Sequence, residues 1–361
     1  MKIGVSPRTT ALVGALLSSA AIISLAQFAQ AQQGAYVGYR VTKETVLPGK
    51  NPRWDHVYID EASRQVFVGR RDMGLTAVNI DTGAVSEVKD TKGTNGAWSA
   101  PDLGIGMSDN GTAADVTVFD LKTLAVKSKI KVPKETDGVW YDPSTKQAYV
   151  NNGDEGSITL FDPVSGKVGE TIALNTKKPE FSAVDGKGRA FVALQDKNQI
   201  AVVDMKGKKL ANTWNVDCIQ PTGMYYEAQT DRLFVPCRGT KPLLAVVDGT
   251  SGKTVYTFPI GLGVDAVSFN PTEKLILTSN GTTGTMSVFK QDSKDAYHLV
   301  ETVATRLGAR THALDPKTGK VFTVTAEYTQ PAPAKEGDRP PPIRWVSDTF
   351  RVIELERGPI Q

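Results

Sequence analysis

Cysteine is scarce in this 361-residue chain, which contains only Cys218 and Cys237. No CxxC or CxxCH stretch occurs, so the sequence supports neither a covalently attached c-type haem nor a cysteine-rich zinc site. An excess of one charge is also missing, because 42 Lys and Arg face 39 Asp and Glu, a formal net charge of +3. So small a surplus gives little driving force from counterion release, and we therefore predict that the protein does not bind nucleic acid.

Long hydrophobic runs are absent after the N-terminus. The first residues combine Lys2 and Arg8, an apolar run from 11 to 26, and Ala29-Gln30-Ala31, which is the pattern of a secretory signal peptide. We predict cleavage after Ala31, which removes residues 1–31 and leaves 32–361 as a periplasmic or secreted protein without a membrane span. An uncleaved anchor is the alternative, but the run is short for a span and no stop-transfer segment follows. Without Lys2 and Arg8 the formal net charge falls from +3 to +1.

A helical period of 3.6 residues is likewise missing after residue 31. The chain instead repeats a unit of four short strands, in which the third strand and the turn after it are clearest. These third strands read LTAVNIDTG (75–83), DVTVFDLKT (115–123), SITLFDPVSG (157–166), QIAVVDMKG (199–207), LLAVVDGTSG (243–252), TMSVFKQDS (285–293) and TFRVIEL (349–355). Units of about 47 residues fit propeller blades. We predict an all-β fold, a seven-bladed β-propeller of four-stranded blades; a β-sandwich or a β-helix explains the repeat less well.

The two ends of the chain suggest how such a ring closes. The sequence stops just after its seventh third strand, 349–355, whereas GYRVTKETVLPG at 38–49 belongs to no unit. We predict that 38–49 is the missing fourth strand of the last blade and pairs with 349–355, which removes an open sheet edge.

The seventh unit also carries a Pro-rich insertion at about 327–348, EYTQPAPAKEGDRPPPIRWVSD. Dense proline disfavours regular sheet and gives a stiff, extended excursion. By its position between a second and a third strand, the insertion should emerge on the face where loops enter the first strands. We interpret it as a lid or a partner-docking arm, or else as a solvated loop without a function.

The phrase YVNN at 149–152, followed by SITLFD, resembles the YVTN repeat of the exported YncE-like seven-bladed β-propellers, with Asn151 where that motif carries Thr. The stretches RLFVPCRG (232–239) and GARTHALDPKTGKVF (308–322) share the pattern, and the resemblance covers residues 38–355. It implies the propeller fold and export. It implies no particular chemistry, because one fold hosts many functions.

The two cysteines are predicted to form a disulfide. An exported protein meets an oxidising compartment, where such a pair is usually bonded. Cys218 precedes the first strand of the fifth blade and Cys237 ends its second strand, so both lie at one end of an antiparallel hairpin. Two buried free thiols are the alternative.

Candidate site residues come from the strand register. In a propeller the first strands line the central channel, and ligands usually bind at the mouth where loops enter them. Counting five residues back from the Asp or Asn that ends each first strand gives Asp55, Asp137, Glu180, Thr222, Asp265 and Arg310. Their neighbours include Arg53, Trp54, His56, Trp98 and His312.

This rim has two interpretations. Asp residues that enter a blade often accept backbone hydrogen bonds, which would make Asp55, Asp137 and Asp265 structural. The residues that break the repeat are the better candidates for a ligand site, namely His56, Glu180, Arg310 and His312, together with Trp54 and Asp137.

We therefore predict a binding or scaffolding propeller that recognises a small anionic ligand or a protein partner at its channel mouth, and that is a monomer. The alternative is a lactonase-type hydrolase with a channel-mouth metal or a His, Glu and Arg site. In that case Glu180, Asp137 and Asn95 would converge. Because no HxH or HExxH spacing occurs, we assign no metal ligand, and the sequence indicates no cofactor.

Overall fold

The computed structural model describes residues 37–359, with gaps at 48, 51 and 331–341. The predicted leader at 1–31 and the centre of the Pro-rich insertion lie outside the described residues. Tyr39–Glu356 belong to one compact unit. The other described residues, 37–38 and 357–359, belong to a second unit, in which the Arg357 guanidinium donates a hydrogen bond to the Val37 carbonyl (3.4 Å).

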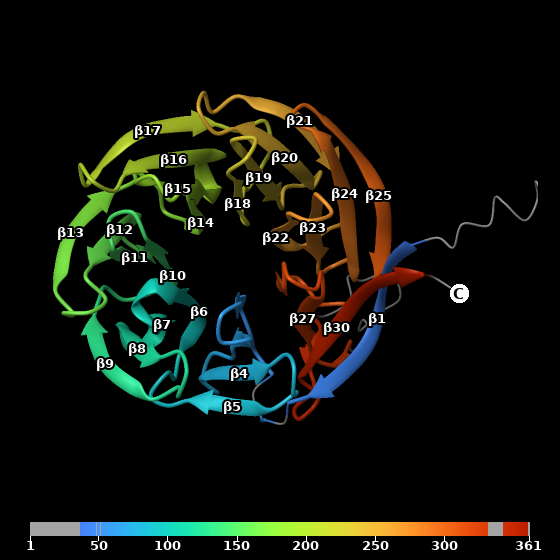
Figure 1. The fold of residues 1–361 in the computed structure, drawn as a ribbon, viewed down its shortest axis with the longest axis horizontal. Coiled ribbons are helices and arrows are strands. Elements are labelled where there is room, and N and C mark those ends of the chain that lie inside the picture. The colour runs from blue at the N-terminus through green and yellow to red at the C-terminus, as the bar shows by residue number, and fades with distance from the viewer. Residues whose placement is uncertain (1–36, 48, 51, 331–341, 360–361) are drawn as a thin grey trace, which may run out of the picture. The chain divides into compact units, whose positions relative to one another are not determined.

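Seven four-stranded antiparallel sheets surround a central axis, as Figure 1 shows, and we number them as blades 1 to 7 in chain order. Blades 1 and 2 have these strands: β2 Val57–Asp60, β3 Gln65–Gly69, β4 Leu75–Asn79, β5 Val85–Val88; β6 Thr94–Ala100, β7 Ile105–Asn110, β8 Asp115–Asp120, β9 Val126–Lys131. Blades 3 and 4 follow: β10 Thr136–Asp142, β11 Gln147–Asn152, β12 Ser157–Phe161, β13 Val168–Ala173; β14 Pro179–Val184, β15 Arg189–Leu194, β16 Gln199–Asp204, β17 Lys209–Asn215.

Blades 5 and 6 continue the series: β18 Tyr225–Glu227, β19 Arg232–Cys237, β20 Leu243–Asp248, β21 Thr254–Pro259; β22 Val264–Asn270, β23 Leu275–Asn280, β24 Thr285–Ser293, β25 Ala296–Ala304. Blade 7 has the order β26 (His312–Leu314), β27 (Val321–Thr325), β30 (Arg351–Pro359) and β1 (Val37–Val46). The described part of the chain has three short 3₁₀ helices, all in loops: η1 Pro101–Leu103, η2 Gly111–Ala113 and η3 Gln195–Lys197. The predicted all-β, seven-bladed fold and its closure by an N-terminal strand are confirmed.

Burial explains why each strand position has its own composition. The third strands β8, β12, β16 and β20 are buried along almost their whole length, because both of their faces pack against neighbouring blades. The fourth strands lie at the periphery (Figure 1) and are mostly exposed, as the pattern of β13 shows. Alternating Lys127, Lys129 and Lys131 on β9 are typical of such an outer edge, where charge discourages pairing with other chains.

The repeated Asp turns the chain after many of the first and third strands. The Asp120 carboxylate accepts backbone N–H bonds from Lys122 (3.0 Å) and Thr123 (2.9 Å), and Asp162 does the same for the two residues at the equivalent positions. An Asp side chain that bonds the backbone two and three residues ahead fixes a tight turn. The periodic sequence is therefore explained by turn formation and needs no functional cause.

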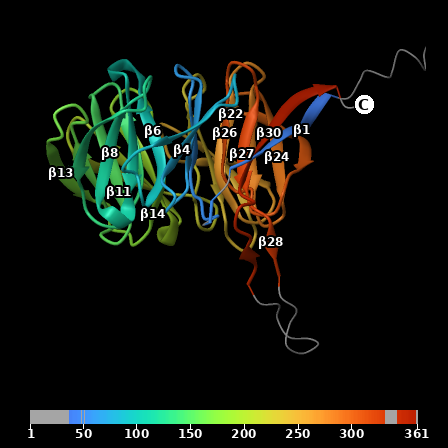
Figure 2. The same cartoon turned by 90° about the horizontal axis from the view of Figure 1, so that it is seen from below.

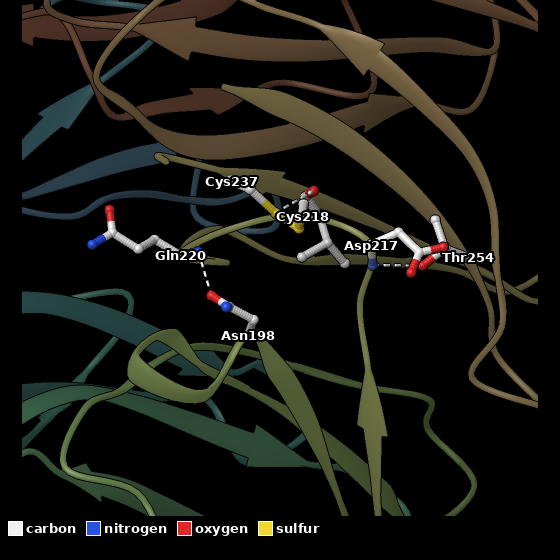
Figure 3. Close-up of a disulfide and its surroundings, with 7 residues drawn as sticks. Asn198, Asp217, Cys218, Gln220, Cys237 and Thr254 are labelled. Carbon is white, nitrogen blue, oxygen red and sulfur yellow. Dashed lines mark hydrogen bonds between the residues drawn. A yellow bond between two sulfur atoms is a disulfide. The ribbon is translucent and has the colours of Figure 1, made fainter. Parts of the chain in front are cut away.

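Cys218 and Cys237 form the predicted disulfide (Figure 3). Cys218 lies in the loop before β18 and Cys237 ends β19, so the bond ties the entry of blade 5 to its own hairpin. Backbone hydrogen bonds hold this loop on both sides: Asp217 N–H donates to Thr254 Oγ1 (3.1 Å), and Gln220 N–H donates to Asn198 Oδ1 (2.9 Å). The loop is thus fixed to blades 4 and 5 as well as crosslinked.

The Pro-rich insertion begins and ends as a two-stranded hairpin, β28 (Tyr328–Thr329) and β29 (Arg344–Trp345), inserted between β27 and β30. Figure 2 shows β28 on one face of the ring. Across the described residues, no helix has the length and apolar character needed to cross a membrane.

Candidate functional site

A cavity of about 740 Å³ opens where the loops entering the first strands meet the loops joining second and third strands. Blades 1 and 3 to 7 contribute to its wall, and the β28–β29 hairpin borders it through Trp345. A cavity of this size is in the range that holds small organic ligands. The predicted location of a site at the channel mouth therefore coincides with a real hollow, while its role in binding stays a prediction.

Four of the six predicted ligand-binding residues line this cavity: His56, Asp137, Glu180 and Arg310. The other two, Trp54 and His312, do not line it. The structure thus brings together residues from blades 1, 3, 4 and 7 that are up to 254 positions apart in sequence, from His56 to Arg310.

Trp54 lies behind the cavity and supports it. Its side chain is buried and packs edge-on against Trp345 (4.8 Å between ring centroids) and against Phe350 (5.5 Å). The Arg310 guanidinium lies over the Trp54 ring, 5.5 Å from the centroid, and donates a hydrogen bond to the Trp54 carbonyl (2.8 Å). Trp54 therefore orients Arg310 without facing a ligand.

His312 is the first residue of β26 and lies buried between blades 6 and 7. Its Nε2 is 2.7 Å from Ser268 Oγ, and its Nδ1 is hydrogen bonded to Ser279 Oγ. Burial lowers the pKa of His312 to about 4, because no carboxylate compensates the cost of a charge there. It is a neutral, satisfied histidine of the blade interface.

Five charged side chains form an alternating arc along one side of the cavity, which we call the arginine arc: Arg71, Asp55, Arg310, Asp265 and Arg238. Asp55 pairs with Arg71 and lies 3.7 Å from an Arg310 nitrogen. Arg310 Nε in turn donates to Asp265 Oδ2 (2.9 Å), and the other Asp265 oxygen pairs with Arg238. Three guanidinium groups thus share two carboxylates, so the arc carries one excess positive charge.

This arc corrects one interpretation of the repeated aspartates. Asp55 and Asp265 do not act as caps for backbone N–H groups; their partners within the described chain are arginine side chains and, for Asp265, the Thr222 hydroxyl (2.9 Å). The capping role belongs to Asp109 at the end of β7, which accepts bonds from the backbone N–H of Gly96 (3.0 Å) and Gly138 (2.9 Å). Counting back from the ends of first strands does not select Asp109, because this residue lies on a second strand.

The cavity wall holds two further charged pairs. His56 Nε2 lies 3.8 Å from Asp137 Oδ1, and Lys178 Nζ lies 3.3 Å from Glu180 Oε1. Burial disfavours the charged imidazole, but Asp55 and Asp137 outweigh it and raise the pKa of His56 to about 9. Burial, aided by Asp137, also raises the pKa of Glu180, to about 7. His56 is therefore cationic at neutral pH, whereas Glu180 takes up a proton far more readily than an ordinary glutamate.

An aromatic cluster packs next to His56, whose ring centroid lies 5.3 Å from that of Phe181. Trp98 lies 4.4 Å from Tyr58 and 6.4 Å from Trp140 between ring centroids, and Phe181 packs edge-on against Trp140 (5.5 Å). The hollow left among these rings is only about 20 Å³. Aromatic packing thus leaves little free space next to His56.

Sequence reasoning missed three cationic residues of the cavity: Arg71, Lys178 and Arg238. Arg71 and Arg238 lie in loops between second and third strands, which open on the same face as the entry loops. The corresponding loops of blades 2, 3 and 6 carry Asn followed by Gly, as in NNGDEG at 151–156, so an Arg at this place was the available signal. Lys178 lies two residues before Glu180. Counting five residues back from the end of each first strand selects one residue per blade, and in blade 4 that residue is Glu180.

Of the three residues expected to converge on a metal, Asp137 and Glu180 share the cavity wall but Asn95 is not part of it. The Asn95 amide nitrogen donates to Asp109 Oδ2 (2.8 Å) and to the Thr136 carbonyl (2.5 Å). Throughout 37–359, gaps aside, no group of three or more His, Cys, Asp or Glu side chains is placed to hold a metal ion. The metal form of the hydrolase hypothesis therefore has no ligand set in this part of the chain.

No protein-family model and no curated protein match the sequence. Solved structures do resemble the fold. A chain of the Kuenenia stuttgartiensis hydrazine synthase is 15% identical with a TM-score of 0.67, covering 77% of this chain and 94% of its own. A chain of a mitotic checkpoint complex is 14% identical (TM-score 0.69; 80% and 89%), and the RRP9 WD40 repeats are 8% identical (TM-score 0.71; 89% and 100%).

Those likenesses establish the seven-bladed propeller and carry no function, because the fold is shared by proteins with unrelated roles. The resemblance to YncE-like propellers stays a prediction.

Proposed function

We propose that this protein is a binding propeller whose channel-mouth cavity holds a small ligand with an anionic group. The observation that carries the proposal is the arginine arc, in which three guanidinium groups share two carboxylates at the wall of a 740 Å³ cavity. Guanidinium recognises carboxylate and phosphate oxygens with paired, directional donors. The excess guanidinium charge, together with cationic His56, favours an anion as the missing partner.

We further propose that the protein acts outside the cytoplasm. The disulfide between Cys218 and Cys237 fits an oxidising compartment, as a periplasmic or secreted protein would meet. We propose that the ligand is therefore taken from outside the cytoplasm, by a protein that acts alone as a monomer.

The test is anion binding measured by NMR titration and thermal shift with phosphate, acetate and citrate. Arg238→Gln leaves Asp265 paired with Arg310 and removes one guanidinium, so it should weaken binding about tenfold or more. Arg344→Gln is the matched control, because Arg344 is exposed and lies outside the cavity wall. If none of the three anions binds, or if both variants weaken binding equally, the proposal fails.

General acid–base catalysis is a second candidate, favoured by Glu180. A carboxyl group with a pKa of about 7 beside a ligand cavity exchanges protons readily at neutral pH. A hydrolase that opens a ring ester would need such a group. Turnover of a panel of lactones by the wild-type protein that is lost in Glu180→Gln would support this candidate. An absence of turnover together with intact anion binding would reject the hydrolase and keep only the binding function.

A further inference from the structure

The wall of the cavity is divided into a charged part and an apolar part. Blades 1 and 3 to 6 supply the charged side chains, with Arg310 of blade 7 completing the arc. The rest of the blade 7 wall is largely apolar. Gln330 there is polar, but Leu307, Ile343 and Trp345 are apolar, and we call these three residues the apolar flank. Ile343 is 38% exposed, and Leu307 and Trp345 are half-buried. A group of partly exposed apolar side chains at a cavity forms a surface that a ligand can cover.

Trp54 joins the apolar flank to the arginine arc. The Arg310 guanidinium lies 5.5 Å from the Trp54 ring centroid, and the Trp345 ring lies 4.8 Å from the same ring. Arg310 and Trp345 therefore both pack against the buried Trp54 ring, which fixes their positions relative to each other. A hydrogen-bond donor for an anion and an apolar surface consequently lie side by side in one pocket.

The hairpin that provides the apolar flank is held in place by the loop before β26. A Cβ on Gly308 would lie 2.4 Å from Trp345 Cη2, so the ring rests directly on this glycine. Trp345 also packs edge-on against Tyr328 of β28 (6.1 Å). The apolar flank is thus a fixed surface, which lowers the entropy that a ligand would lose by binding to it.

We propose that the cavity takes a carboxylic acid with an apolar, preferably aromatic, body next to its carboxylate. The carboxylate is held by the guanidinium groups of the arginine arc, and the body covers Ile343 and Trp345. This inference rests on the proposed anion binding and adds the ligand class. Inorganic phosphate or a small fully charged acid would satisfy the arc and leave the apolar flank in water, so neither uses the whole pocket.

Four probes separate the two contributions: acetate, 3-phenylpropionate, 3-phenylpropanol and inorganic phosphate. Dissociation constants are measured by ligand-observed NMR titration. For a probe that binds too weakly to saturate the site, the lower limit of its dissociation constant is used in the comparison. Covering a phenyl ring is worth about tenfold or more in affinity, so 3-phenylpropionate should bind at least that much more tightly than acetate. It should also bind about tenfold more tightly than the alcohol, which lacks the charge.

Variants locate the effect. Ile343→Ser and Trp345→Ala should each raise the dissociation constant of 3-phenylpropionate about fivefold or more and leave that of acetate or phosphate unchanged. Val164→Ser is the control, because Val164 is an exposed apolar residue in a turn far from the cavity wall. Should Trp345→Ala disturb the hairpin, Ile343→Ser still reports on the apolar flank.

The outcomes distinguish this inference from the proposed function. Equal binding of acetate and 3-phenylpropionate, with loss of both in Arg238→Gln, would overturn the aromatic acid and keep the anion site. Equal binding of 3-phenylpropionate and 3-phenylpropanol would overturn both the aromatic acid and the anion site. Tight binding of phosphate alone would identify an inorganic anion as the ligand and reject the proposal.

Discussion

Blade 3 and blade 7 have the same four-stranded architecture but are put together differently. Blade 3 runs through one continuous stretch, β10 to β13, whereas blade 7 takes three strands from the end of the chain and β1 from its beginning. Asp142 and Asp315 turn the chain at equivalent points of the two blades, each bonding the backbone N–H two residues ahead (3.1 Å in both). The two blades can therefore be compared position by position.

Counted back from those aspartates, equivalent positions hold Asp137 and Val139 in blade 3 but Arg310 and His312 in blade 7. Blade 7 also carries the β28–β29 hairpin and the apolar flank of the cavity. The shared positions form turns and core, and the differing ones determine the character of the cavity and of the adjoining blade interface. The comparison shows that function in a repeat protein is best sought where one repeat departs from the others, provided that burial is considered too.

The largest difference between the blades should appear when β1 is removed. A chain starting at Pro52 loses the outer strand of blade 7, together with buried Tyr39 and Leu47, and no other strand can replace them. Losing two large buried side chains should lower the free energy of unfolding by about 5 kcal/mol or more. Urea unfolding measures this, with a chain starting at Val37 as the control. A Pro52 chain as stable as the control would contradict the closed ring.

A buried histidine should make blade 7 sensitive to acid. His312 has a pKa of about 4 in the folded protein and 6.5 as its ordinary value. Between these values the unfolded chain binds more protons at this position than the folded protein does. The contribution of neutral His312 to the free energy of unfolding is therefore complete above pH 6.5 and is lost as the pH falls toward 4. The contribution amounts to about 3 kcal/mol at most.

His312→Val, which introduces the residue of blade 3, should flatten the pH dependence of the free energy of unfolding across that range. His298→Gln is the control, because His298 is exposed on β25. An unchanged slope in His312→Val would show that another group titrates there.

The sequence allowed the fold to be predicted almost completely, because turn-forming Asp and Gly and strand alternation recur in every unit. The cavity could be predicted only in part. Register placed His56 and Arg310 on one rim, but it could not show that His312 turns into the interface between blades 6 and 7. It also placed the insertion that carries Trp345 on that face, but it could not give the position of the Trp345 ring, which depends on packing against Gly308 and Trp54. Such contacts between distant segments produce no repeated pattern in the amino-acid sequence.

Two glycines test whether the hairpin of blade 7 is held as described. Gly308 has φ of +84° and its missing Cβ would meet Trp345, whereas Gly166 in blade 3 has φ of +73° and its nearest neighbour would be 3.7 Å away. Gly166→Ala should cost about 1 kcal/mol, from backbone strain alone. Gly308→Ala should cost about 2 to 3 kcal/mol and change the tryptophan fluorescence, because the Trp345 ring must move. Equal costs and an unchanged spectrum would mean that Trp345 does not rest on Gly308.

The smallest difference concerns the equivalent rim residues Arg310 and Asp137. Arg310 is fixed by Asp265, by the Trp54 carbonyl and by the Trp54 ring, so Arg310→Ala should lower the free energy of unfolding by about 1 to 2 kcal/mol. Asp137 has a partly exposed side chain and one ion pair, at 3.8 Å from His56, so Asp137→Ala should cost less than about 1 kcal/mol. Urea unfolding of both variants at neutral pH measures the difference. If Asp137→Ala proves as costly as Arg310→Ala, the packing of Arg310 on Trp54 does not stabilise the arc, and the link between the charged and apolar parts of the cavity is lost with it.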